Sequence, residues 1–100
     1  MPVRVPRPEV FALHKMLVAQ LRGAMREKQG KDVAQAAVLV AVLAEDAPDT
    51  LEEAYGGLPR RARLVAREGA RRVLGRLEAA GDEQGADVLR VALGVRAGRR

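Results

Sequence analysis

Three basic residues, Lys15, Arg22 and Lys31, have the types and the spacing of a phosphate-binding group. Lys15 and Arg22 are seven residues apart and share one sector of a helix, while Lys31 begins the next predicted helix. Cations that converge in this way hold a polyanion such as a nucleotide triphosphate, and the planar fork of arginine grips two phosphate oxygens. The alternative is a solvated flank, in which the aliphatic stems of these residues cover the edge of the core.

Three polar neighbours are candidates for holding these cations in place. His14 is central on the apolar face of the first predicted helix, which is typical of a core histidine whose ring is hydrogen-bonded. Its ring is also within reach of Asp32 or Gln35 across the predicted helix pair, where a hydrogen bond would support the basic edge. The chain has one histidine and no cysteine, so a thiolate or all-histidine metal site is excluded, and we predict no metal ligands.

A second basic group lies in the C-terminal part of the chain. Residues 58–100 contain eleven arginines and five acidic residues, a net charge of +6, whereas residues 1–57 sum to −1. Four arginines of a predicted fourth helix are candidates for a nucleic-acid surface: Arg60, Arg63, Arg67 and Arg71. The scarcity of aromatic residues argues against stacking on single strands, and an arginine-rich composition that reflects GC-rich coding is the alternative.

Motifs for catalysis by this chain alone are missing. There is no serine and one threonine, Thr50, so a serine nucleophile is excluded. The sequence contains no glycine-rich phosphate loop, no HExxH or CxxC motif, and no Asp-x-Asp or Asp-x-Glu pair that would hold two catalytic cations. The acidic residues between positions 45 and 53 fall at predicted helix ends, where capping explains them. We therefore do not expect this chain to catalyse a reaction by itself.

The element that must organise these residues is the stretch from Val33 to Ala44, in which Gln35 is the one residue that is not apolar. A helix that is apolar on every side must be surrounded by other segments, so we predict a central buried helix at about residues 31–45. Its apolar run spans about 18 Å, too short to cross a bilayer. Apolar periodicity, prolines and glycines predict four more helices, at about residues 8–28, 48–55, 59–80 and 83–94.

The predicted fold class is therefore all-α, a small bundle of four to five helices. One hundred residues allow a single domain, which we place at residues 8–95, after an extended lead-in at residues 1–7 and before a frayed basic tail at residues 96–100. The predicted apolar face of the first helix contains Val10, His14, Leu17, Leu21 and Met25. Without cysteine, an export signal or a spanning segment, the expected location is the cytoplasm.

The N-terminal half carries a resemblance to a known superfamily. The segment VRVPRPEVFALHKMLVAQLR and the Lys-Asp-x-x-Gln-Ala start of the next helix resemble the C-terminal helical region of bacterial nucleotidyltransferase-fold proteins of the DNA polymerase β superfamily. The resemblance covers about residues 3–55. The matching positions are Val3, Val5, Pro6, Pro8, His14, Lys15, Arg22, Lys31, Asp32, Gln35 and Ala36.

The resemblance implies a helical substrate-binding or accessory domain of a nucleotidyltransferase-like protein, with Lys15, Arg22 and Lys31 against the substrate phosphates. Asp32 would orient His14 or Lys15. The reaction, with Mg²⁺ and a nucleoside triphosphate, would belong to a catalytic half that is expected before Val3 or on a separate chain. Two alternatives remain from the residues themselves: an arginine-rich nucleic-acid-binding module, and a structural module that binds a protein through its small-residue faces.

Overall fold

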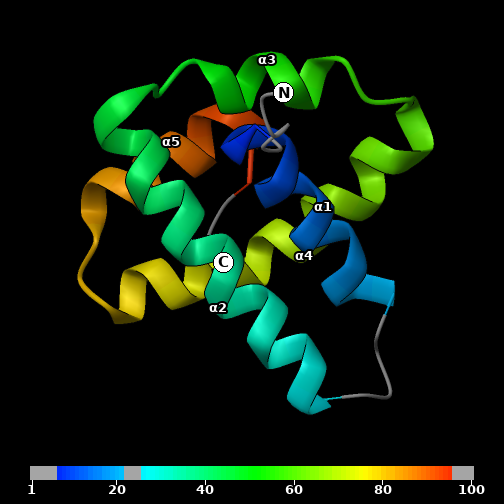
Figure 1. The fold of residues 1–100 in the computed structure, drawn as a ribbon, viewed down its shortest axis with the longest axis horizontal. Coiled ribbons are helices and arrows are strands. Elements are labelled where there is room, and N and C mark those ends of the chain that lie inside the picture. The colour runs from blue at the N-terminus through cyan, green and yellow to red at the C-terminus, as the bar shows by residue number, and fades with distance from the viewer. Residues whose placement is uncertain (1–6, 22–25, 96–100) are drawn as a thin grey trace, which may run out of the picture.

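Five α-helices and no strands make up the part of the chain that the structure describes, residues 7–21 and 26–95 of a computed structural model (Figure 1). The all-α class predicted from the sequence is confirmed. The predicted lead-in, apart from Arg7, and the predicted tail lie outside the described residues. In chain order the helices are α1 (Pro8–Leu21), α2 (Arg26–Asp46), α3 (Thr50–Gly56), α4 (Arg60–Ala79) and α5 (Glu83–Leu93). None of these described helices is long and apolar enough to cross a membrane.

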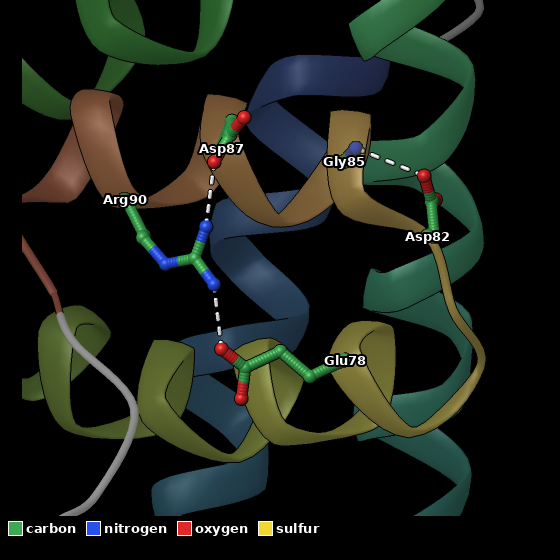
Figure 2. A network of polar contacts seen from close by, with 5 residues as sticks. All are labelled: Glu78, Asp82, Gly85, Asp87 and Arg90. Carbon is green, nitrogen blue, oxygen red and sulfur yellow. Dashed lines mark hydrogen bonds and ion pairs between the residues drawn. The ribbon is translucent and has the colours of Figure 1, made fainter.

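The helix boundaries follow the residues that punctuate the sequence. Pro8 is the first residue of α1, and Pro59 precedes the first residue of α4. At the start of a helix a backbone N–H group has no intrahelical partner, so proline, which has no N–H group, costs nothing there. Asp82 caps α5, because its carboxylate accepts a hydrogen bond of 2.9 Å from the backbone nitrogen of Gly85 (Figure 2). Gly94 ends α5 in the left-handed conformation, with φ of 66°, which a residue without a Cβ adopts at no steric cost.

The junction between the first two helices lies earlier than predicted. We expected the first helix to continue to about Lys28 and to stop at Gln29 and Gly30, but both residues lie inside α2, which begins at Arg26. The side-chain amide of Gln29 donates a hydrogen bond of 2.8 Å to the carbonyl of Ala19 near the end of α1. The sequence does not show that the side chain of a residue ten positions later will bond a carbonyl near the end of α1.

The buried face of α1 differs from the predicted one. Ala12, Leu13, Met16 and Ala19 are buried, whereas His14 is exposed and Val10 keeps 50% of its surface accessible. Met25 of the predicted face lies outside the described residues. The reason is close packing against α4, since a Cβ added at Gly69 would lie within 2.9 Å of the carbonyl carbon of Met16. Such an approach places alanines at the helix contact and turns the larger side chains away from it.

The helix α2 is buried on one side only, which corrects the prediction of burial all round. Its inner face contributes Val33, Ala36, Val40 and Leu43 to the core, while Val38 and Val42 are 63% and 46% exposed. Contacts with α1, α4 and α5 cover that inner face. α1 shares the centre of the bundle, because it packs against α2, α3 and α4 (Figure 1). A bundle this small has too few helices to enclose one of them completely.

A face of α4 that consists largely of small residues is buried. Ala66, Gly69, Ala70, Val73 and Leu77 all lie in the core, and the opposite side of the helix carries exposed arginines. Leu89, Ala92 and Val95 complete the core from α5 and the residues after it. The fold therefore leaves two charged regions at its surface, one where α1 meets α2 and one along α4.

Candidate functional site

The site is centred on an ion pair between α1 and α2. The ammonium nitrogen of Lys15 lies 3.3 Å from Oδ1 of Asp32, whose side chain is 6% exposed, while that of Lys15 is 20% exposed. The same ammonium lies 5.3 Å from the ring centroid of Phe11, a distance at which the negative face of the ring attracts a cation. Lys15 is thus held in one orientation at the rim of the core.

Helix geometry explains how these residues meet. Phe11 and Lys15 are four residues apart on α1, so their side chains lie on the same side of the helix. Asp32 precedes Val33 on the inner side of α2 and is buried with it against α1. A buried carboxylate requires a partner, and Lys15 supplies one from the facing helix.

The remaining residues of the predicted phosphate group are distributed differently. Lys31 is exposed at the position before Asp32 on α2. Arg22, the third predicted phosphate contact, lies outside the described residues. Gln35 is exposed. Among the described residues, no hydrogen bond joins it to His14, its predicted partner.

His14 does not lie in the core and does not contact Asp32, which corrects the prediction for this residue. Its side chain is exposed and lines a cavity of about 320 Å³ between the start of α1 and the end of α3. Val10, Leu17 and Leu58 line the same cavity, which is therefore mostly apolar. Sequence reasoning missed this cavity because its two walls come from segments about forty residues apart, and no local pattern links them.

The arginines of α4 form the second charged region. Arg60, Arg67 and Arg71 are exposed, whereas Arg63 is half-buried on the side of α4 toward Tyr55, whose hydroxyl group donates a 3.4 Å hydrogen bond to the carbonyl of Arg63. Arg67 donates a hydrogen bond of 2.9 Å to the carbonyl of Gly94. Of the four arginines predicted for a nucleic-acid surface, three are therefore exposed, and Arg63 is the one that is half-buried.

Arg90 links the last two helices by pairing with two carboxylates (Figure 2). Both terminal nitrogens of Arg90 on α5 lie 2.6 Å from a carboxylate oxygen, one of Glu78 on α4 and one of Asp87 on α5. The hydrogen bond that Arg90 donates to Glu78 raises the pKa of Arg90 above its ordinary value, and the negative charges of Glu78 and Asp87 add to this effect. One positive charge is shared between two negative charges, so the network braces the helix pair and the guanidinium is already engaged on both sides.

A comparison with protein families decides what kind of protein this is. A family model described as Nucleotidyltransferase matches residues 1–58, more than half of the chain. The chain belongs to this nucleotidyltransferase family. The match contains α1, α2 and α3, and with them both residues of the ion pair, whereas α4 and α5 lie beyond it. No curated protein and no solved structure matches the chain.

The family membership confirms the nucleotidyltransferase part of the predicted resemblance, over nearly the same residues. The bacterial origin and the separate catalytic half stay predictions. Among the described residues of this nucleotidyltransferase chain, no three acidic, histidine or cysteine side chains converge in a way that would hold a metal ion. The candidate site of the family segment is therefore a basic one, in which Lys15 pairs with a buried carboxylate and Lys31 is exposed at the preceding position of the sequence.

Proposed function

We propose that this chain is a helical substrate-binding module of a nucleotidyltransferase system and that Lys15, Lys31 and Arg22 bind the phosphates of a nucleoside triphosphate. The observation that supports the proposal most is the ion pair of Lys15 with Asp32, 3.3 Å apart, inside the segment that matches the family. The pair orients an ammonium group before any ligand arrives, which lowers the entropy lost when phosphate binds.

The ammonium of Lys15 retains donors for a ligand. A lysine ammonium has three N–H groups, and the pair with Asp32 occupies one of them. The exposed part of the side chain lies where α1 meets α2, and Lys31 directly precedes Asp32 on α2. Two cations placed around one carboxylate keep a net positive charge, so an anion is still attracted to this position.

Stability alone accounts poorly for a buried aspartate paired with a partly buried lysine. The cost of removing two charges from water offsets most of their attraction, so an apolar pair of similar size would stabilise the fold as well or better. The ion pair is better explained by the orientation that it gives to the ammonium group of Lys15 at the surface. This argument favours a binding role for Lys15 over the role of a solvated flank.

We place the catalytic chemistry in a partner. Nucleotidyl transfer by the superfamily that the chain resembles uses Mg²⁺, but the described residues offer no converging carboxylates for it and do not fit this ion. The module would therefore form one wall of a nucleotide cleft, and a catalytic nucleotidyltransferase domain or subunit would supply the metal-binding wall. We place this assembly in the cytoplasm, where nucleoside triphosphates are available.

Calorimetric titration of the purified chain with a nucleoside triphosphate tests the proposal. We expect weak binding, with a dissociation constant of about 1 mM or tighter, and a loss of about tenfold in affinity for Arg22→Ala or Lys31→Ala. Arg7→Ala is the matched control, because it removes the same charge from an exposed side chain at the start of α1. If Arg7→Ala weakens binding as much as the other two variants, the proposed site is wrong.

The same titration identifies the contribution of Lys15. Lys15→Met removes the oriented ammonium, and Lys15→Arg keeps the charge while changing its shape. We expect the arginine variant to retain more affinity than the methionine variant, while circular dichroism shows the same helix content for both. Equal affinity of the wild type and Lys15→Met would contradict the role of Lys15 in phosphate binding.

A further inference from the structure

We propose that the outer face of α4 binds the phosphate backbones of double-stranded nucleic acid. The proposal does not depend on the nucleotide site, because α4 lies beyond the segment that matches the family. Six exposed arginines form this face in two rows along the helix. The first row is Arg60, Arg67 and Arg71, and the second row is Arg61, Arg72 and Arg76.

The two rows have the spacing of a helix that lies along a groove. At about 100° per residue, the rows are separated by roughly a third of the helix circumference. Between them run Leu64, Glu68 and Gly75, which are all exposed. A helix with its side chains is about 10–12 Å wide, close to the width of the major groove of B-DNA, which is about 12 Å. Each row would then face the phosphates of one strand.

The length of the face suits several phosphate contacts. The seventeen residues from Arg60 to Arg76 span a rise of about 24 Å, which corresponds to roughly seven base-pair steps at 3.4 Å each. No described segment covers the arginines on this side, since all six are exposed while the opposite side of α4 is packed against α1, α2 and α5.

The positive charge of the face is largely uncompensated. Arg60, Arg61, Arg72 and Arg76 form no ion pair with any described residue, and Arg71 pairs with Glu68 at 3.6 Å. Glu78 lies near the end of the first row, where Arg90, which also pairs with Asp87, holds its carboxylate at 2.6 Å (Figure 2). Solvated protein surfaces usually intersperse both signs of charge, so a helix face with this excess points to a polyanion.

Two other kinds of partner fit the face less well. A membrane surface binds helices that present an apolar side, but the apolar side of α4 lies in the core, and of its larger aliphatic residues Leu64 is the one that is well exposed. Single-stranded nucleic acid binds proteins that offer aromatic side chains for stacking, and neither α4 nor α5 contains any. A duplex needs neither feature, because phosphate contacts alone supply its affinity.

Fluorescence anisotropy with a labelled DNA duplex of about 20 base pairs tests the proposal over salt concentrations from about 50 to 200 mM. We expect the logarithm of the association constant to fall against the logarithm of salt concentration with a slope of about −5, as six phosphate contacts predict. The double variant Arg61→Gln, Arg72→Gln should bring this slope about two units closer to zero and weaken binding.

The matched control is the double variant Arg7→Gln, Lys28→Gln, which removes the same two charges from exposed residues outside α4. It should leave the salt slope unchanged. A second pair of variants tests the groove geometry: Leu64→Glu places a negative charge between the two rows, and Val38→Glu places the same charge on an exposed residue of α2. We expect a loss of affinity of about tenfold or more for Leu64→Glu only.

Three results would overturn the proposal. The first is an equal effect of the two double variants, which would show a response to net charge alone. The second is an equal effect of Leu64→Glu and Val38→Glu, which would show that α4 does not lie along a groove. The third is equal affinity for the duplex, for a single strand of the same length and for polyglutamate, which would indicate a surface for polyanions in general or for an acidic protein.

Discussion

The ammonium nitrogen of Lys15 lies 3.3 Å from Oδ1 of Asp32 and joins α1 to α2 at the edge of the core. The two helices share the most extensive contact in the described part of the chain, and both contribute apolar residues to the core. The ion pair is therefore a polar point beside an apolar contact, and the hydrogen bond from Gln29 to the carbonyl of Ala19 is a second one. The ion pair fixes the orientation of the proposed phosphate-binding lysine.

We expect Lys15→Met to lower the free energy of unfolding by about 1–3 kcal/mol, because the carboxylate of Asp32 stays buried after it loses a charged partner. Urea unfolding followed by circular dichroism measures the change. Lys28→Met is the control, since Lys28 is exposed on α2, and its effect should stay within about 0.5 kcal/mol. Equal stability of the two variants would mean that the ion pair does not hold the helices together.

We expect Gly69→Ala to destabilise the fold by about 1–3 kcal/mol or more, because the new Cβ would meet the carbonyl group of Met16 and force α4 away from α1. Gly75 is the matched control on the same helix. A Cβ at that position would meet nothing within 4 Å, so Gly75→Ala should stabilise the protein by about 0.5–1 kcal/mol through helix propensity alone. Thermal unfolding measures the melting temperature of both variants. A rise in melting temperature for both would contradict the close approach of α1 and α4.

We expect Val40→Asp to unfold the domain, because Val40 is fully buried and an unpaired charge would have to enter the core. Val38→Asp makes the same chemical change two residues earlier on α2, where the side chain is 63% exposed. That variant should retain its helix content and its melting temperature within a few degrees. Circular dichroism distinguishes the two results, and loss of structure in both variants would contradict the one-sided burial of α2.

We expect Asp82→Ala to cost about 1 kcal/mol, because it removes the hydrogen bond that caps α5 at the backbone nitrogen of Gly85 (Figure 2). Asp49 provides the comparison, since it precedes α3 without a capping hydrogen bond from its side chain. Asp49→Ala should therefore change stability by only a few tenths of a kcal/mol. Chemical denaturation measures the free energy of unfolding of both variants. A larger loss of stability for Asp49→Ala than for Asp82→Ala would contradict the capping role of Asp82.

The sequence by itself determined the elements of this protein. Pro8, Pro59, Asp82 and Gly94 act through their own backbone and nearest neighbours, so their positions predicted where helices begin or end. The small-residue face of α4 was also predictable, because every residue of that face belongs to one regular helix and its angular position follows from the count of residues. The family segment was recognisable because its fixed spacings lie within 58 consecutive residues.

Only the tertiary structure decided how the helices turn toward one another. Helical periodicity gives the angles between residues of one helix, but it does not say which sector meets a neighbour, so Ala12 and Met16 are buried where His14 was expected. The pairing of Asp32 with Lys15 rather than with His14 follows from that rotation. The exposure of Val38 follows from the small number of helices that surround α2, because the burial of a residue depends on neighbours that are distant in the sequence.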